Sequence, residues 1–406
     1  MAKTLVVACD GTWNDRTSET NIHWLSDAAV ADDRQLVFYD PGVGTAGDFD
    51  AKVGGNFGVG LSANVRQAYS FIREHYQPGD AVFLLGFSRG AFTVRSLAGF
   101  MRLVGRLESA DAIVDAYVYY RIHEPGEDDT IFERWFRPEI GGPLPVRFLG
   151  VFDTVGALGL PFELEDKAPD VRDTPWAHVA RWLGELGDRV RRPVKGFHDT
   201  RLGDQVETAA QALAIDETRG FFVPTLWTSA PGTALKQGET GQTFQVRQSV
   251  EQVWFAGSHI DVGGGDTTTP RAERLCNLPL LWMAERAAAA GMRFRPGYIE
   301  DLRAWTAGLA TAAQHDPMTE KWRALHAKTG IRPAPRPIGN AARRAASREG
   351  GHWPLVETPE AVHHSLRQRL GRTVVVEGEA GSVEQRYAPA NLPPELIASA
   401  PRAGFG

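Results

Sequence analysis

Short runs of apolar residues, most of them ending in Asp, Gly or Ser, alternate along the chain with helix-length segments. Runs that are apolar at consecutive positions are typical of strands buried on both faces of a parallel sheet. Five such runs occupy residues 4–12, 35–45, 81–90, 146–156 and 252–265. Two intervening segments, residues 61–76 and 271–290, have the pattern of helices. The pattern predicts an α/β fold with a doubly wound, mostly parallel sheet and polar residues gathered at the strand ends.

Two segments interrupt this alternation, at about residues 105–145 and 160–215. Both contain helical-looking stretches separated by loops, so we expect helical cap insertions over one edge of the sheet. The composition changes after the predicted core at residues 1–292, and residues 293–406 are expected to form a partly loop-rich C-terminal extension packed on it. Within this extension, residues 331–351 are rich in Pro, Arg, Ala and Gly and are expected to be a surface excursion.

Composition narrows the function classes. The 406 residues are 43% hydrophobic and 23% charged, which is typical of a globular chain. A net charge of −6 without a basic patch argues against nucleic-acid binding. The two cysteines, Cys9 and Cys276, predict neither a disulfide framework nor a zinc site. The sequence shows no signal peptide and no apolar run of about 20 residues, so we expect a protein that is cytoplasmic as synthesised and exported, if at all, independently of a signal peptide.

The stretch "GFSRG" at residues 86–90 joins a buried run to a small-residue helix. Glycine-x-serine-x-glycine at such a junction is the pattern of a nucleophile elbow, whose glycines let the serine adopt a strained backbone and expose its hydroxyl. A tight turn that merely contains Ser88 is the alternative. The strand before and the helix after it favour Ser88 as a nucleophile.

A serine hydroxyl needs a base to remove its proton and a carboxylate to orient that base. Asp153 and His259 each follow an apolar run, and Ser88, Asp153 and His259 occur in the chain order of hydrolase elbows. We therefore predict a catalytic triad of these three residues. A helix-capping role for Asp153 is the alternative, and Asp261 and Asp216 are rival acids.

Acyl transfer also requires hydrogen-bond donors for the oxyanion. The backbone N–H of Arg89, directly after the nucleophile, is the first candidate. Gly11 and Thr12, in the loop after the first strand, are the second, with Asp10 expected to brace that loop.

Neither a nucleotide nor a metal is expected. The glycine-rich residues 52–65 lack the Gly-Lys-Ser/Thr of a phosphate-binding loop and are expected to form a flexible wall near the substrate. His259 and Asp261 offer two metal ligands without a third. The predicted chemistry needs no cofactor.

Several of these stretches together resemble a known family. They are "CDGTWND", "FYDPGVGT", "GFSRGAFTVRSLAG", "FLGVFDTVGALG", "ALAIDETRGFF" and "VWFAGSHIDVGGG". The chain resembles the α/β-hydrolase domain family that includes the first class of type VI secretion lipase effectors, which are phospholipases of A type. The resemblance implies Ser88 as nucleophile, His259 and an acid as its partners, and a fatty-acyl ester, such as a glycerophospholipid, as substrate. Two departures from the family pattern, Gln211 in place of a histidine and residues 266–270 in place of an aromatic, concern the pocket rather than the triad.

We therefore interpret the chain as a serine carboxylic-ester hydrolase of the lipase or phospholipase type, acting through an acyl-enzyme. The expected partners are a lipid or other acyl-ester substrate, a membrane surface and, at family level, an immunity or secretion partner, with no nucleic acid. Two alternatives stay open. One is an esterase or thioesterase for small soluble esters, and the other is a catalytically silent binding or scaffold protein on the same fold.

Overall fold

The computed structural model describes residues 2–11, 14, 16–42, 57–122, 138–140, 142–155, 202–227, 233–237, 243–339, 342–343 and 360–399. Its strands are β1 (Thr4–Cys9), β2 (Gln35–Asp40), β3 (Ala81–Phe87), β4 (Arg106–Leu107), β5 (Pro138–Ile140), β6 (Val146–Phe152), β7 (Val206–Ala214), β8 (Thr233–Gln237), β9 (Thr243–Arg247), β10 (Ser249–Phe255), β11 (Gln314–His315), β12 (Ala361–Val362), β13 (Thr373–Gly378) and β14 (Gly381–Arg386). Its α-helices are α1 (Asn21–Ala28), α3 (Phe57–His75), α4 (Arg89–Val104), α5 (Ala112–Ile122), α9 (His259–Gly263), α10 (Asn277–Ala289), α11 (Tyr298–Thr306), α12 (Glu320–Thr329), α14 (Ser365–Arg369) and α15 (Pro394–Ser399). Short 3-10 helices occupy Arg16–Ser18, Arg271–Glu273 and Leu309–Thr311.

A seven-stranded sheet forms the centre of the molecule, in the order β12-β10-β7-β6-β3-β1-β2. Every neighbouring pair in it is parallel. The chain passes from β1 to β2 on one side and then to β3 on the other, so β1 and β3 flank the point where the strand order reverses. In open α/β sheets the carboxyl ends of the strands at this point form the usual site of chemistry. The predicted doubly wound, mostly parallel sheet is confirmed.

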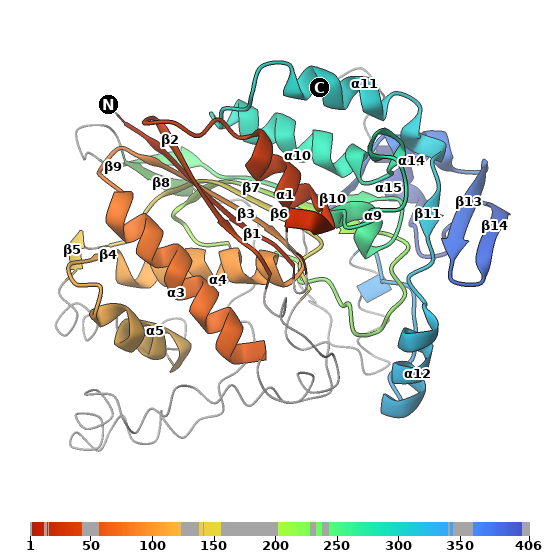
Figure 1. The fold of residues 1–406 in the computed structure, drawn as a ribbon, viewed down its shortest axis with the longest axis horizontal. Coiled ribbons are helices and arrows are strands. Elements are labelled where there is room, and N and C mark those ends of the chain that lie inside the picture. The colour runs from red at the N-terminus through yellow and green to blue at the C-terminus, as the bar shows by residue number, and fades with distance from the viewer. Residues whose placement is uncertain are drawn as a thin grey trace.

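Helices cover both faces of this sheet (Figure 1). Leu5 and Val7 of β1 point into a core that includes side chains of α3, α4 and α5. Val6 and Ala8 point into the opposite core, which includes side chains of α1, α10 and α11. Because both faces of β1 are buried, neighbouring positions must all be apolar, which explains the continuous runs in the sequence.

Strand β7 corrects one sequence-based expectation. Residues 160–215 were expected to form a helical insertion, but Val206–Ala214 is a strand in the middle of the sheet, between β6 and β10. Its sequence "VETAAQALA" is rich in alanine, which has low strand propensity, and its side chains from Ala209 to Ala214 are buried. Residues 156–201 lie outside the described residues, so the rest of this predicted insertion does too.

The C-terminal residues extend the sheet and add a third apolar cluster. Val362 of β12 pairs with Trp254 of β10, and this cluster joins Leu213 and Trp254 to side chains of α14, β13 and the C-terminal loop. In Figure 1 the β13–β14 hairpin and α12 lie at the right of the view, beyond strand β10. Among the described residues, no helix has the length and apolar character needed to cross a membrane.

Residues 331–339, which we call the C-terminal strap, are the first part of the predicted surface excursion at residues 331–351. The expected exposure holds for residues 332–335, but Arg336 is 3% exposed and Ile338 is fully buried. Residues 344–351 lie outside the described residues.

Candidate active site

Ser88 lies at the sharp turn between β3 and α4. Its backbone has φ 55° and ψ −117°, a conformation that non-glycine residues rarely adopt. Its N–H donates to the carbonyl of Phe152 at 3.0 Å, which ties the turn to the end of the neighbouring strand β6. A strained serine at a strand-to-helix turn is the arrangement that the "GFSRG" pattern predicts.

The two glycines of the turn allow the backbone segments to approach one another. A Cβ on Gly86 would lie 2.6 Å from the Gly90 carbonyl oxygen and from the Ala91 Cα. A Cβ on Gly90 would lie 2.0 Å from the carbonyl oxygen of Cys9 in β1. These contacts are with backbone atoms, which have little room to move. Glycine at both positions is therefore required for β3, α4 and β1 to meet at Ser88.

Asp153 and His259 form a buried pair at the same edge of the sheet. Asp153 directly follows β6 and is 0% exposed, and His259 begins α9 and is 5% exposed. The Nδ1 of His259 lies 2.5 Å from Oδ2 of Asp153. The imidazole also packs against Phe87, the residue before Ser88, with ring centroids 4.6 Å apart. The pair thus lies beside the elbow. Nδ1 of the imidazole bonds with the carboxylate, and Nε2 lies on the other side of the ring.

The charges of this pair follow from its surroundings. Burial alone would raise the pKa of Asp153, but the charge of Arg336 and the hydrogen bond from His259 outweigh it and hold the pKa well below its usual range. Burial lowers the pKa of His259 from its ordinary value, although the bond to Asp153 acts in the opposite direction. An ionised carboxylate next to a neutral imidazole is the state in which Nδ1–H donates and Nε2 is free to accept a proton.

Arg336 of the C-terminal strap is bonded to both oxygens of Asp153. Its Nη1 donates to Oδ1 at 2.6 Å and its Nη2 to Oδ2 at 2.9 Å. The same guanidinium donates to the carbonyl of Ala214 at 2.9 Å and to that of Phe222 at 2.6 Å. Asp153 also accepts the N–H of Ala214 at 3.0 Å. The carboxylate is thereby held from three directions, by His259, the end of β7 and the strap.

A second buried carboxylate, Glu217, supports the histidine from its backbone side. It accepts the His259 N–H at 3.2 Å and bonds with the side chain of Arg219 at 2.7 Å. Burial alone would raise the pKa of Glu217, but its hydrogen bonds and charge interaction with Arg219 lower it. Arg219 in turn lies over the ring of Phe222, which packs edge-on against the imidazole of His259. The loop after β7 therefore orients His259.

The oxyanion-hole candidates lie next to Ser88, with one complication. Arg89 is the first residue of α4, where backbone N–H groups have no acceptor within the helix. A Cβ on Gly11 would lie 3.4 Å from Cβ of Ser88, so Gly11 is adjacent to the elbow. The Gly11 N–H, however, donates to Oδ1 of Asp10 at 2.8 Å, so an oxyanion would have to compete with that carboxylate. Thr12 lies outside the described residues.

Asp10 is buried and braces the loop after β1. Its Oδ2 accepts the hydroxyls of Thr20 at 2.5 Å and Tyr39 at 2.9 Å. The glycine-rich stretch 52–65 lies partly outside the described residues, and its remaining part is the first half of α3. Among the residues that the structure describes, no group of three His, Cys, Asp or Glu side chains is arranged to hold a metal ion.

The two rival acids have other partners. Asp261 accepts from Ser258 and lies 2.6 Å from Nδ1 of His315 through its Oδ1. Asp216 accepts the N–H of Gly257 at 2.6 Å and the hydroxyl of Tyr387 at 2.9 Å, and burial raises its pKa to about 6. Of the three acids considered from the sequence, Asp153 is the one placed on His259.

The residues at the two departures from the family pattern have hydrogen-bond partners other than His259 and Asp153. Gln211 is fully buried in β7 and bonds with Arg95 and the carbonyl of Thr225, so it serves the core on the α4 side of the sheet. Asp266 accepts the N–H and hydroxyl of Thr268, which closes a local turn.

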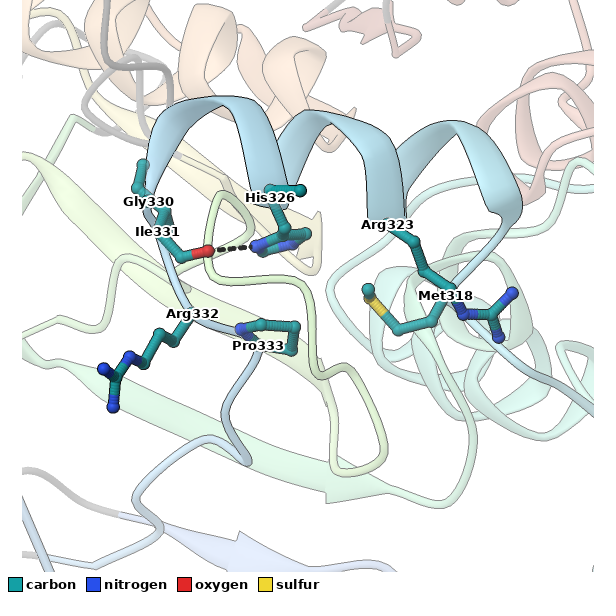
Figure 2. A pocket seen from close by; sticks show the side chains of 8 residues that line it. Met318, Arg323, His326, Gly330, Ile331, Arg332 and Pro333 are labelled. Atoms are coloured by element: carbon teal, nitrogen blue, oxygen red, sulfur yellow. Dashed lines mark hydrogen bonds between the residues drawn. The ribbon is translucent and has the colours of Figure 1, made fainter.

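An aromatic cluster connects His259 to the surface near α12. Phe222 contacts both His259 and Trp322, with ring centroids 4.9 and 5.2 Å away. An open pocket of about 500 Å³ lies beside this cluster. Figure 2 shows its lining side chains, among them His326, which bonds with the carbonyl of Ile331. The pocket is lined by Met318, Arg323, His326, Ala327, Gly330, Ile331, Arg332 and Pro333.

Sequence reasoning missed Glu217, Arg219 and Arg336. The stretch "AIDETRGFF" contains the first two, but the only candidate site residue that the sequence indicates in it is Asp216. A spacing of two residues between an acid and an arginine in a loop was the available signal for an ion pair. Arg336 had no such signal, because it lies 183 residues from the carboxylate that it binds.

Comparisons with known proteins identify a family for most of the chain. Residues 3–286 match the model of the family described as "T6SS, Phospholipase effector Tle1-like, catalytic domain". The uncharacterized protein YEL023C of Saccharomyces cerevisiae is 26% identical over 74% of this chain and 59% of its own.

Two solved structures were also matched. An uncharacterized protein from Pseudomonas aeruginosa aligns with 16% identity and a TM-score of 0.38, over 87% of this chain and 52% of that one. The Tle1 effector bound to the VgrG spike of the type 6 secretion system aligns with 18% identity and a TM-score of 0.36, over 66% of this chain and 52% of that one. This chain thus spans between 52% and 59% of the length of these relatives.

Proposed function

Because the chain belongs to the family of Tle1-like phospholipase effector catalytic domains, we propose that it is a serine carboxylic-ester hydrolase that cleaves fatty-acyl esters of phospholipids. The observation that carries the proposal is the buried His259–Asp153 pair beside the strained Ser88. A neutral imidazole oriented by a carboxylate, next to a serine at a nucleophile elbow, is the machinery of acyl transfer.

The proposed reaction has two halves. The Ser88 oxygen attacks the ester carbonyl while Nε2 of His259 takes the hydroxyl proton, and Asp153 stabilises the imidazolium through Nδ1–H. The Arg89 N–H, with Gly11 or Thr12 as second donor, binds the oxyanion. Collapse of the tetrahedral intermediate releases the alcohol, which receives the proton from His259. Water then attacks the acyl-serine by the same route and releases the fatty acid.

Trapping of the nucleophile tests the proposal directly. A fluorophosphonate forms a covalent bond with an activated serine, so the wild type should be labelled and Ser88→Ala should not. Ser96→Ala, on the same helix α4 and half-buried, is the matched control and should keep the label. An unlabelled wild-type protein would leave the catalytically silent scaffold as the better account.

Substrate preference separates a phospholipase from an esterase. Rates are compared on p-nitrophenyl esters of increasing chain length and on vesicles of phosphatidylcholine and phosphatidylglycerol, with the released lipids identified by mass spectrometry. Fatty acid and lysophospholipid released from vesicles support the proposal. A rate that falls steeply with acyl length, together with intact vesicles, indicates the small-ester hydrolase instead.

The family's description as a type VI secretion effector supports a proposal on delivery. We propose export through such a system, without a signal peptide, to act on the membrane lipids of a target cell. The test compares the amount of the chain in the medium of producing cells with and without a working type VI apparatus. Equal amounts in the two media would contradict this route while leaving the hydrolase proposal intact.

A further inference from the structure

The arginine that holds the catalytic carboxylate comes from outside the stretch that matches the family. The match ends at residue 286, and Arg336 lies 50 residues further along, on the C-terminal strap. Its guanidinium is almost fully buried and reaches both oxygens of Asp153. A segment beyond the matched catalytic stretch therefore contributes to the centre of the candidate site.

The strap is fixed on both sides of Arg336. On one side, the Ala334 N–H donates to the carbonyl of Thr218 at 2.9 Å. On the other, Asn391 donates to the carbonyl of Arg336 itself at 3.0 Å and to that of Ile215 at 3.1 Å. These bonds attach the strap to the loop after β7, so the guanidinium approaches Asp153 from a defined direction.

The same guanidinium also orders the surroundings of the imidazole. Its bond to the Phe222 carbonyl holds the residue whose ring packs against His259. Its bond to the Ala214 carbonyl fixes the end of β7. Arg336 thus connects the carboxylate that orients His259 with the aromatic ring that confines it.

We propose that Arg336 is a positioning residue of this active site, clamping Asp153 so that His259 is held as a neutral, correctly oriented base for Ser88. The inference rests on the proposed function. Arginine suits the role because its planar fork bonds a carboxylate through two parallel N–H groups, whereas lysine presents a single point charge.

The clamp has an electrostatic consequence for the base. Within the described part of the chain, the charged groups that act on the pair are Glu217 and Arg219 of the loop after β7 and Arg336 of the strap. Arg336 neutralises part of the Asp153 charge that would otherwise stabilise a protonated imidazole. Without it, the full carboxylate charge would raise the pKa of His259, and the base would become protonated at a higher pH.

Two substitutions test the proposal, with kcat and KM for p-nitrophenyl butyrate measured from about pH 5 to about pH 9. In Arg336→Gln the charge is lost, so the acid limb of kcat/KM should move up by about one pH unit. Its kcat should fall about 10²-fold with little change in KM, because the base is misplaced rather than the substrate released. In Arg336→Lys the charge remains without the fork, so the acid limb should stay in place while kcat falls by an intermediate amount.

Arg369→Lys is the matched control. Arg369 is fully buried in the same C-terminal region and bonds with Ala310, Ala312 and Gln314, away from the catalytic pair. A role of Arg336 in folding alone would make the two lysine variants alike, with activity following the folded fraction measured by circular dichroism and no shift in pH profile.

The outcomes separate the two proposals. If the wild-type protein shows neither hydrolysis nor fluorophosphonate labelling, the proposed function is overturned and this inference with it. The inference alone is overturned if the wild type is active and Arg336→Gln folds, keeps the acid limb of its kcat/KM profile in place and has a kcat within about threefold of wild type. If Arg336→Gln does not fold, Arg336→Lys decides: a loss of kcat beyond that of Arg369→Lys supports positioning, and an equal effect overturns it.

Discussion

Two histidine–aspartate pairs lie at α9, one at each of its faces, and their surroundings shift the pKa of the histidine in opposite directions. The inner pair is His259 with Asp153, and the outer pair is His315 with Asp261. Their N–O distances are 2.5 and 2.6 Å, so geometry within each pair does not distinguish them. The surrounding charges distinguish the two pairs, because the inner pair faces Arg336 whereas the outer pair faces the carboxylates of Asp266 and Glu377.

The pKa of each histidine follows from this difference. His259 is buried and shares its aspartate with an arginine, so its pKa is lowered. Burial alone would also lower the pKa of His315, but the charges of Asp261, Asp266 and Glu377 outweigh burial and raise it. The inner histidine is suited to accept a proton, and the outer one keeps its proton to a higher pH than an ordinary histidine does. The same two residue types thus favour a neutral imidazole in one place and a charged imidazole in the other.

Removal of each imidazole in turn should give the largest contrast. His259→Ala removes the base for Ser88, so kcat on a phospholipid or p-nitrophenyl ester should fall by about 10⁶-fold. His315→Ala removes a partner of the structural ion pair and should lower kcat by less than about tenfold. Steady-state kinetics check both, with thermal melts to show that the variants fold. Comparable losses in the two variants would contradict the assignment of the inner pair as the catalytic one.

Exchange of each carboxylate for an amide gives the next largest effect. Asp153→Asn disturbs the tautomer and charge that orient His259, so kcat should fall by about 10⁴-fold. Asp261→Asn weakens the cap on Ser258 and the bond to His315, so it should cost about 1–2 kcal/mol of stability and less than about tenfold in kcat. Denaturant unfolding gives the stability and steady-state rates give kcat. A larger kcat loss in Asp261→Asn would move the acid of the triad to Asp261.

The pH dependence of activity should sharpen the comparison further. His259 must be neutral to act as a base, so activity is lost as the pH falls through its pKa in the free enzyme. Because that pKa is lowered from its ordinary value of 6.5, the acid limb of kcat/KM should lie below about pH 6.5. A pH profile of kcat/KM measures it, and His315→Gln should leave the limb in place. An acid limb well above pH 7 would show that the imidazole is not held neutral.

The sequence predicted the residues of the inner pair because their positions follow from a rule about strands. Ser88, Asp153 and His259 each come shortly after an apolar run, and parallel strands bring such ends to one edge. What it left open was which acid binds the histidine. That choice depends on the direction of side chains, since Asp261 is two residues from His259 and yet faces His315 on the other side of α9.

The remaining misses have a common physical cause, which is that their signals lie in contacts distant along the chain. The sequence predicts a helical insertion where strand β7 lies, because the alanines of this strand have little strand propensity. Its place in the sheet comes from pairing with β6 and β10 on either side. Arg336 lies in a proline-rich stretch whose composition suggests solvent exposure. Its burial is stabilised by Asp153, which no local pattern could reveal.

The smallest predicted effect concerns the outer pair and the pH dependence of folding. The pKa of His315 is raised in the folded protein, so its protonation stabilises the fold fully below its unfolded value of about 6.5 and the contribution disappears as the pH rises through the folded pKa. His315→Gln should therefore be less stable than wild type by about 1 kcal/mol near pH 5.5, with the gap closing at alkaline pH. Urea unfolding of both proteins across this range measures the gap. A gap that widens with pH would reverse the sign of the linkage, and the outer pair would then hold a neutral histidine like the inner one.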